Sequence, residues 1–273
     1  MKAAGLFLLF FLSHLESFAQ NIEAHSWILF NSVSGEILSE HQADKVSSPA
    51  SLTKVLTAYV VLKEIKEQRL SPRSLIVVPS LVLQTRQEES QMYLKPGNRV
   101  SIRDLLKGLI VMSANDAALA LADYVGGSPK NFVQMMNRAA KEIGMKQSSF
   151  VNPTGLFAPG HYSTAKDLML LAKAISQQYP EYFEYSSLPE MTYNSFRKKN
   201  TNELLGRSLA VDGMKTGHIK AAGWCVMVSA KKTFSAGGER VIAIVLGSPS
   251  NEKRTQAGLQ LIRKGLGIIP ELD

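Results

Sequence analysis

The chain has 273 residues, of which 45% are hydrophobic and 20% are charged, and its net charge is +8. This composition supports a sizeable folded core and excludes a disordered chain, a collagen-like repeat and a small disulfide-bonded scaffold. The single cysteine, Cys225, forms no internal disulfide, and with only five histidines it argues against a zinc cluster. We therefore expect an ordinary globular protein without a metal or other cofactor.

The N-terminal residues have the pattern of an export signal. Lys2 precedes an apolar run over 3–12, and Ser-Phe-Ala at 17–19 fits the small-x-small rule for signal-peptide cleavage. The run is too short to span a bilayer stably. We predict a signal peptide over 1–19 and an exported, soluble protein in the periplasm or outside the cell. Because Lys and Arg are dispersed along the chain, we expect no nucleic-acid partner.

The exported part begins with strands and continues with helices. Turn-rich residues 31–35 lie between two apolar runs, 26–30 and 36–39, which predicts a β-hairpin. From Ser51 onward, apolar residues recur at three- and four-residue steps, as in an amphipathic helix. Pro49, just before this stretch, helps to set the start of the helix.

Helix-start signals continue through the middle of the chain. Ser101 and Thr164 each have an aspartate three positions later, which completes a capping box, and Ser128 precedes a proline. Strand patterns return over 211–215, 224–229 and 241–246, and a last helix is predicted over 251–266. We predict an α+β fold in which the N- and C-terminal segments share one antiparallel sheet flanked by helices, and the central helices form a second lobe.

Three short motifs carry the chemical signal: Ser-x-x-Lys at 51–54, Ser-x-Asn at 113–115 and Lys-Thr-Gly at 215–217. The first two each arise by chance about once in a few hundred positions, whereas Lys-Thr-Gly arises roughly once in several thousand. Taken singly, Ser51 is better explained as a helix cap, and the other motif residues as a solvated lysine, a helix end and a strand end. Together and in this order, the three motifs indicate one site.

The first motif has the chemistry of an activated serine nucleophile. Lys54 lies one helical turn from Ser51, so its amine can accept the proton of the Ser51 hydroxyl. A lysine acts as a base only when it is neutral. We expect burial, the positive end of the helix dipole and a second cation, Lys215, to lower the pKa of Lys54.

The other two motifs supply groups that handle the substrate. Ser113 can relay a proton from a lysine to a leaving amine, and the Asn115 amide can donate to a substrate carbonyl or hold Lys54 in place. Thr216 offers a hydroxyl for a substrate carboxylate, and Gly217 lets a substrate backbone lie against the strand edge.

Residues near the third motif are more ambiguous. His218 either lines the site, where it would titrate near neutral pH, or is a polar residue at a strand end. Trp27 and Trp224 lie in apolar strands and are predicted to be core residues, and Cys225, beside Trp224, is predicted to be a small buried hydrophobe. Three histidines are predicted to be surface or packing residues: His25, His41 and His161.

With these motifs the chain resembles the serine-type D-Ala-D-Ala carboxypeptidases, the low-molecular-mass penicillin-binding proteins of the β-lactamase/transpeptidase-like group. The resemblance extends over 49–54, 113–117, 152–156, 162–168 and 211–218. It implies that Ser51 forms an acyl-enzyme, Lys54 accepts its proton, Ser113 is a further catalytic residue and Lys215 binds substrate.

The resemblance also implies a reaction and its ligands. Ser51 would attack the carbonyl of the penultimate D-Ala of a peptidoglycan stem peptide, while backbone N–H groups at Ser51 and near His218 hold the oxyanion. The terminal D-Ala would leave, and water would then hydrolyse the acyl-enzyme. Penicillins and other β-lactams would acylate Ser51 and leave slowly.

Two departures from the family pattern bear on substrate and membrane binding. We expect a single domain over 20–273, without the second, β-rich domain and the C-terminal membrane anchor that many such enzymes carry. We expect 259–269 to pack against the sheet rather than to bind a membrane. Thr201 stands where members carry an arginine that helps to bind the substrate carboxylate. The candidate replacements are Arg197, Lys215, Thr216 and His218.

Three alternatives remain. A class A β-lactamase would need a Glu-x-x-Leu-Asn loop, but the only carboxylates over 117–166 are Asp123 and Glu142, and neither has that context. We therefore expect slow penicillin turnover. A DD-endopeptidase that cuts D-Ala cross-links would use the same residues. A non-catalytic penicillin-sensing or wall-binding module would keep the site and lack turnover.

Overall fold

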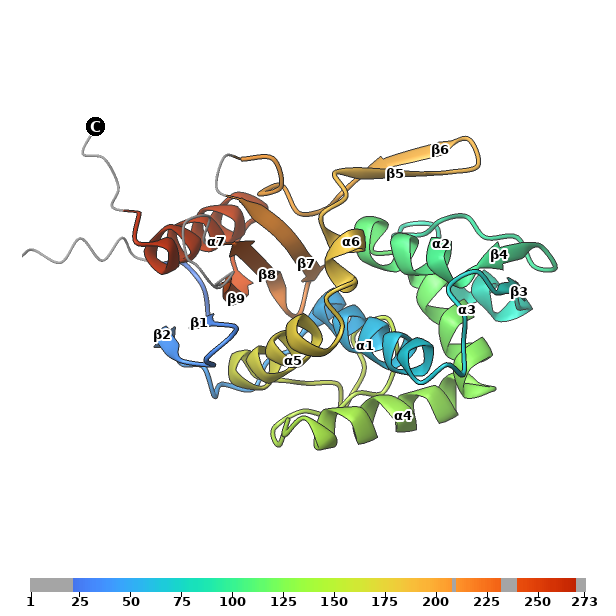
Figure 1. Cartoon of the computed structure of the whole chain (residues 1–273), viewed down its shortest axis with the longest axis horizontal. Helices are drawn as coiled ribbons and strands as arrows, with labels where there is room; N and C mark the ends of the chain where they lie inside the picture. Colours follow the sequence, from blue (N-terminus) through green and yellow to red (C-terminus); the bar gives the residue numbers. More distant parts are fainter. Residues whose placement is uncertain (1–21, 208–209, 232–239, 269–273) are drawn as a thin grey trace, which may run out of the picture.

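One antiparallel sheet joins the two ends of the chain (Figure 1). The structure is a computed structural model that describes residues 22–207, 210–231 and 240–268. The strands lie in the order β2-β1-β9-β8-β7. Their bounds are β1 Ser26–Asn31, β2 Ile37–His41, β7 Val211–Ile219, β8 Gly223–Lys231 and β9 Arg240–Ser248. The predicted hairpin and the shared sheet are both confirmed.

Helices cover both faces of this sheet. On one face lies α7 (Asn251–Leu266), whose Leu261 and Ile262 are buried against apolar residues of β8 and β9. On the other face lies α5 (Ala165–Gln178), which contacts β1 and β9 (Figure 1). Because both faces are covered, β9 is buried along nearly its whole length. The last predicted helix therefore packs on the sheet as expected, although Ile269 lies outside the described residues.

The central helices form the second lobe (Figure 1). They are α1 Thr53–Lys66, α2 Ile102–Lys107, α3 Asn115–Gly126 and α4 Pro129–Glu142. The predicted capping boxes start two helices: Ser101 Oγ accepts the Asp104 N–H at 3.0 Å, and Thr164 Oγ1 accepts the Asp167 N–H at 3.0 Å. Local capping signals thus placed the helix starts correctly.

Several short elements were not predicted. They are the two-stranded sheets β3 Leu75–Val77 with β4 Arg99–Ser101 and β5 Glu190–Tyr193 with β6 Phe196–Lys199, the helix α6 Tyr182–Ser186, the 3₁₀ turns η1 Ala50–Leu52 and η2 Ser80–Gln84, and the π-helical turn η3 Gly108–Met112. Strands of three or four residues show too little alternation to be recognised. The hairpin β5–β6 projects from the body near the helical lobe (Figure 1).

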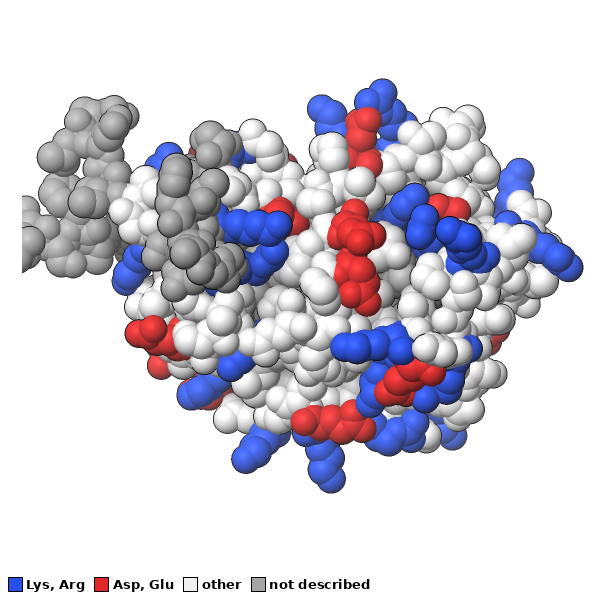
Figure 2. All heavy atoms as spheres, viewed as in Figure 1, with Lys and Arg blue, Asp and Glu red and all other residues white. Residues whose placement is uncertain are grey.

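Charge is mixed over the face shown in Figure 2. Lys and Arg lie over several elements, with Asp and Glu between them near the middle of that face, so the positive excess is not gathered there. Within the described ranges, every helix is too short or too polar to cross a membrane. The predicted signal peptide over 1–19 lies outside the described residues.

Candidate active site

Ser51 and Lys54 meet at the start of α1. Ser51 lies in the turn η1, and Lys54 lies in the first turn of the helix, where its side chain is fully buried. Lys54 Nζ is 3.0 Å from Ser51 Oγ and donates to the Thr154 carbonyl oxygen at 2.6 Å. The helix cap is Leu52, and no side chain caps this helix. The Ser51 side chain thus contacts Lys54 and does not cap the helix, so its interpretation as a mere helix cap is wrong.

Burial brings the proton affinity of Lys54 into the neutral range. Desolvation lowers the pKa of its amine to about 7, although the carboxylates of Glu89 and Asp116 oppose this effect. A substantial fraction of Lys54 is therefore neutral near pH 7. The neutral amine has the lone pair that a general base needs, and it lies within hydrogen-bond distance of the hydroxyl it would deprotonate.

Lys215 is the second buried lysine of the site. It lies on β7, and its Nζ donates to the Thr216 carbonyl oxygen at 2.8 Å. Burial lowers the pKa of Lys215 well below its usual value, and repulsion from Lys54 lowers it further. We expected burial, the helix dipole and Lys215 to lower the pKa of Lys54 together, but burial is the cause of its downward shift. Two buried amines that repel each other favour a state in which one is neutral.

Two glycines allow the backbone to close around the nucleophile. An added Cβ at Gly217 would lie 2.9 Å from the Ser51 nitrogen, so β7 can approach η1 only with glycine there. An added Cβ at Gly155 would lie 1.9 Å from the Ala50 carbonyl oxygen, and the φ of Gly155 is +83°. Gly217 was predicted to let a substrate backbone lie against β7. In the structure it also lets β7 lie close to the protein's own backbone at Ser51.

The second motif lies at the opening of the helical lobe. The π-helical turn η3 ends at Ser113, which has a left-handed φ of 60°, and Asn115 starts α3. Asn115 Nδ2 donates to Glu89 Oε2 at 2.7 Å, and the Asn115 backbone N–H donates to the Ser90 carbonyl oxygen at 2.7 Å. The hydrogen bonds of Lys54 within the described residues go to Ser51 and Thr154, so the alternative that Asn115 holds Lys54 stays a prediction. The second N–H of Asn115 and its oxygen remain for a substrate.

A buried carboxylate fixes the loop that follows η2. Asp116 accepts the backbone N–H groups of Met92 at 2.9 Å and Leu94 at 3.0 Å. Burial raises the pKa of Asp116, while these hydrogen bonds to the ionised form oppose that rise. Asp116 therefore ties the loop that carries Glu89 and Ser90 to the start of α3, beside the second motif.

A cleft of about 480 Å³ contains residues of all three motifs, including Ser51, Ser113 and Thr216. At one end, Thr216 Oγ1 donates to Thr201 Oγ1 at 2.7 Å. The buried guanidinium of Arg254, from α7, lines the same cleft. Burial lowers its pKa to about 10, which leaves it charged at neutral pH. The cleft therefore contains a cation and two hydroxyls, a combination that suits a carboxylate.

A sequence profile described as D-alanyl-D-alanine carboxypeptidase matches residues 14–250. The chain belongs to the D-alanyl-D-alanine carboxypeptidase family. It is 40% identical over 252 residues to the D-alanyl-D-alanine carboxypeptidase DacC of Escherichia coli K12, which covers 90% of this chain. It spans 62% of the length of that relative.

Solved structures of family members share the fold. Penicillin-binding protein 6B of Escherichia coli superposes with a TM-score of 0.84 and 39% identity, covering 89% of this chain and 77% of its own. The ampicillin-bound form of penicillin-binding protein D2 from Listeria monocytogenes superposes with a TM-score of 0.79 and 35% identity, covering 90% of this chain and 98% of its own. The predicted transpeptidase-like fold is therefore confirmed.

Some residues that were predicted for this site lie elsewhere. Arg197 is exposed on the β5–β6 hairpin and pairs with Glu190, so it does not replace the arginine missing at Thr201. Trp224 is only partly buried and lines the cleft, so its assignment to the core is wrong. His218 lines the cleft as well, and its ring stacks on Trp224 with centroids 3.9 Å apart. The prediction that His218 belongs to the site is supported by this geometry.

Sequence reasoning missed three residues of the site. Arg254 looks like an ordinary charged residue of an amphipathic helix, and Glu89 lies in an irregular loop. Lys198, half-buried on β6, donates to Ser90 Oγ at 3.3 Å. None of them belongs to a recognisable motif, and only the tertiary fold brings Arg254 and Glu89 to the cleft and Lys198 to Ser90, which lines it. The carboxylates weighed for a β-lactamase lie elsewhere: Glu142, for example, pairs with Lys63 at 2.7 Å on the helical lobe.

Proposed function

We propose that this chain is an exported serine D-Ala-D-Ala carboxypeptidase that removes the terminal D-alanine from peptidoglycan stem pentapeptides. The observation that carries this proposal is the pair formed by Ser51 Oγ and the buried Lys54 amine, 3.0 Å apart. It supports acyl transfer because the amine is neutral often enough to act as a base. The domain proposed to do so covers 20–273.

In the acylation step, neutral Lys54 accepts the proton of Ser51 as Oγ attacks the carbonyl of the penultimate D-Ala. The C–O bond to Ser51 forms, and the amide C–N bond to the terminal D-Ala breaks. Ser113, which lines the same cleft, relays a proton to the departing amine. Backbone N–H groups at Ser51 and on β7 near His218 stabilise the oxyanion. Water then hydrolyses the acyl-enzyme and frees Ser51.

Strand β7 is suited to bind the peptide backbone. It is the edge strand of the sheet, and β8 pairs with it on one side only. A substrate that lies along the other side extends the sheet by one strand, with the uncommitted amide hydrogen of Asn115 opposite. This arrangement would present the scissile carbonyl to Ser51, beside which Gly217 brings β7.

The terminal carboxylate would bind at the end of the cleft that holds Thr216 and Arg254. Arg254 is charged and buried, and its guanidinium lies 5.2 Å from the ring centroid of Trp224. Hydrogen bonds from an ionised donor to a carboxylate are stronger than neutral ones. Arg254 would therefore bind the substrate carboxylate in place of the arginine that family members carry at the position of Thr201, which has no charge. Lys215, buried beside Thr216, adds positive charge whenever it is protonated.

Release of free D-Ala from diacetyl-L-Lys-D-Ala-D-Ala tests the proposed function. We expect steady release by the purified chain, and we expect mass spectrometry of a penicillin-treated digest to place one adduct on Ser51. Ser51→Ala should abolish both while keeping the circular dichroism spectrum, since activated serine nucleophiles contribute about 10⁴–10⁶-fold in rate.

Two other results would point to different functions. Penicillin labelling without D-Ala release would favour a penicillin-sensing module. Cleavage of cross-linked dimers with no release of terminal D-Ala would favour an endopeptidase. An adduct in Ser51→Ala would show that the nucleophile is another residue.

A further inference from the structure

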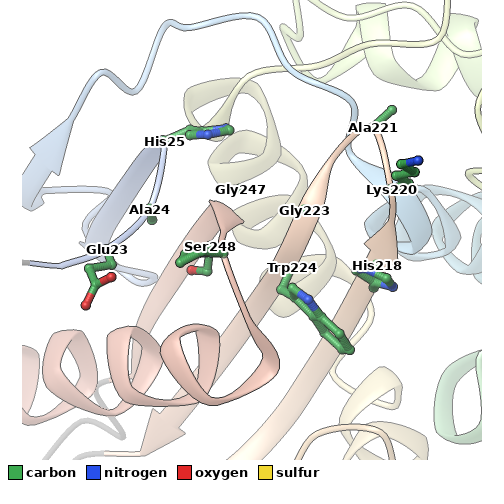
Figure 3. A pocket seen from close by; sticks show the side chains of 11 residues that line it. Glu23, Ala24, His25, His218, Lys220, Ala221, Gly223, Trp224, Gly247 and Ser248 are labelled. Carbon is green, nitrogen blue, oxygen red and sulfur yellow. The ribbon is translucent and has the colours of Figure 1, made fainter.

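The loop that follows η2, residues 85–94, forms part of the wall of the active-site cleft. Another part of the wall consists of His218 and Trp224, whose rings extend side by side from β7 and β8 (Figure 3). The 85–94 loop contributes two carboxylates to the cleft, Glu88 and Glu89. The catalytic steps described above use neither of them.

Glu89 is the carboxylate that the fold places against the second motif. Its side chain is only 8% exposed, whereas that of Glu88 is 67% exposed. Both oxygens of Glu89 accept hydrogen bonds: Oε2 accepts from Asn115 Nδ2 at 2.7 Å, and Oε1 accepts from Arg86 Nε at 2.9 Å. The position of the Glu89 carboxylate is therefore fixed from two sides.

The 85–94 loop is attached to the start of α3 without the help of the Glu89 side chain. The Asp116 carboxylate accepts two backbone N–H groups of the loop, and the Asn115 backbone N–H donates to the Ser90 carbonyl oxygen at 2.7 Å. Neither contact involves the Glu89 carboxylate. The hydrogen bond between Glu89 and the Asn115 side chain therefore has a consequence beyond anchoring the loop.

That consequence is the direction of the Asn115 amide. An amide side chain can turn by half a revolution and exchange the places of its nitrogen and its oxygen. A carboxylate only accepts hydrogen bonds, so Asn115 can face Glu89 only with an N–H. The reversed amide would set oxygen against oxygen and leave buried acceptors unsatisfied. Glu89 thus selects one of the two orientations before a substrate arrives.

We propose that Glu89 is a positioning residue of the active site, which holds the Asn115 amide in the single orientation in which its second N–H donates to a carbonyl in the acyl part of the substrate. This inference rests on the proposed function. Glu89 itself touches no reacting atom and transfers no proton. Its effect is that the donor needs no reorientation when the substrate binds.

The charge of Glu89 also acts on the base of the reaction. Burial lowers the pKa of Lys54, whereas the negative charges of Glu89 and Asp116 raise it. Two further titratable groups near Lys54 are Lys215 and His161, and burial, followed by the positive charge of Lys54, lowers the pKa of both. Removal of the Glu89 charge should therefore lower the pKa of Lys54, an effect that a merely structural role of Glu89 would not produce.

The test compares the acylation of Ser51 by benzylpenicillin and by 6-aminopenicillanic acid. Both have the β-lactam ring and its carboxylate, but only benzylpenicillin carries a side-chain amide carbonyl for Asn115. The variants are Glu89→Ala, which removes the acceptor, and Glu89→Gln, which keeps an acceptor oxygen but adds an N–H. Glu40→Gln, at an exposed position of β2 on the sheet edge away from β7, is the control with the same change of charge.

At pH 9, Lys54 is largely neutral in every variant, so the rates report the orientation of Asn115 alone. Glu89→Ala should lower the benzylpenicillin rate by about 3- to 10-fold, the effect of one ordinary hydrogen bond, and should leave the 6-aminopenicillanic acid rate within about twofold. Glu89→Gln should give a smaller fall, because it accommodates both orientations of the amide. In both Glu89 variants the pH of half-maximal rate should move to a lower value for both ligands, and Glu40→Gln should match the wild type.

Three results would overturn the inference. The first is an equal fall for both ligands in a Glu89→Ala variant that keeps the circular dichroism spectrum, since this would indicate a general structural role. The second is an unchanged benzylpenicillin rate at pH 9, because Asn115 would then be oriented without Glu89. The third is an unchanged pH of half-maximal rate in Glu89→Gln, which would mean that no charged carboxylate lies beside Lys54.

Two further outcomes are separated by the same measurements. If Glu89→Ala does not fold, Glu89→Gln decides the question: a fall confined to benzylpenicillin supports the inference, and an equal fall or none contradicts it. A wild-type chain that neither ligand labels would instead contradict the proposed function itself.

Discussion

The two ends of the active-site cleft differ in how their polar groups are satisfied. At the acylating end, Lys54 is buried and already bonded to Ser51 and to the Thr154 carbonyl oxygen. At the proposed carboxylate end, the Arg254 guanidinium donates to Asn251 Oδ1 and faces the Trp224 ring, and the exposed His218 also lines the cleft. The first end is held by internal hydrogen bonds, whereas at the second end the Arg254 guanidinium has further N–H groups beside the one that Asn251 accepts.

This difference separates chemistry from selection. Groups that are fixed by internal hydrogen bonds are positioned before a substrate arrives, which favours the transition state. Groups with unused donors gain most when a ligand satisfies them, and they therefore determine which ligand binds. Changes at the acylating end should lower kcat, and changes at the carboxylate end should raise KM.

The largest effect is expected for Lys54→Met. The substitution keeps an unbranched side chain and removes the base, so we expect the acylation rate of penicillin at Ser51 to fall roughly 100- to 10,000-fold. In the wild type, kcat/KM should rise as the pH increases through about 7, because deprotonation of Lys54 produces the active base. Stopped-flow labelling between pH 5 and 9 measures both.

Lys66→Met is the matched control for this prediction, since Lys66 is an exposed lysine near the end of the same helix. It should leave the labelling rate and its pH dependence unchanged. Wild-type labelling that stays flat across pH 7, or a Lys54→Met variant that labels at the wild-type rate, would exclude Lys54 as the base.

A smaller effect is expected for Arg254→Ala. Loss of a charge-assisted hydrogen bond costs about 1.5–3 kcal/mol, which corresponds to roughly 10- to 100-fold in affinity. The rise should appear in KM for diacetyl-L-Lys-D-Ala-D-Ala, with kcat little changed, because the carboxylate is held equally in ground and transition states. Arg263→Ala, an exposed position on the same helix, should have no effect.

Adding Thr201→Arg sharpens this prediction. Thr201 Oγ1 lies 2.7 Å from Thr216 Oγ1, so a guanidinium placed there enters the same end of the cleft. In the Arg254→Ala background it should recover part of the lost affinity. If Arg254→Ala instead lowers kcat with KM unchanged, the carboxylate binds elsewhere.

Much of the fold followed from local sequence signals. Capping at Ser101 and Thr164 is a chemical event within one helical turn, so the sequence displays it directly. The β5–β6 hairpin and α6 escaped prediction because their few residues carry no clear periodicity. Their positions depend on packing against η3, which is remote in sequence.

The active site divides in the same way. Ser51 and Lys54 are one helical turn apart, and their contact could be inferred from spacing alone. The hydrogen-bond partner of Asn115 is Glu89. Glu89 belongs to no motif, and its contact with Asn115 depends on how its loop folds. The Arg254 side chain reaches the cleft because α7 crosses the sheet at one place, a relation that only the tertiary structure determines.

The smallest effect is expected for His161, whose ring contacts Thr53, the residue before Lys54. Its Nδ1 accepts the Val151 N–H at 3.2 Å, so the ring proton is on Nε2, which donates to Thr53 Oγ1 at 2.8 Å. Burial lowers the pKa of His161 to about 4, and Lys54 contributes to the shift. Between pH 6.5 and 4 the unfolded chain therefore binds more protons at this residue than the folded chain does.

Stability should consequently fall as the pH drops from 7 to 5, and His161 should account for roughly 1–2 kcal/mol of that fall. His161→Gln offers an amide acceptor to Val151 and an amide donor to Thr53 but does not titrate, so its free energy of unfolding should depend less on pH. Urea denaturation of both proteins at pH 7 and pH 5 measures the difference. An identical pH dependence would mean that His161 takes up its proton at the same pH in the folded and the unfolded chain, and its ring would then face Thr53 in a different way from the one described.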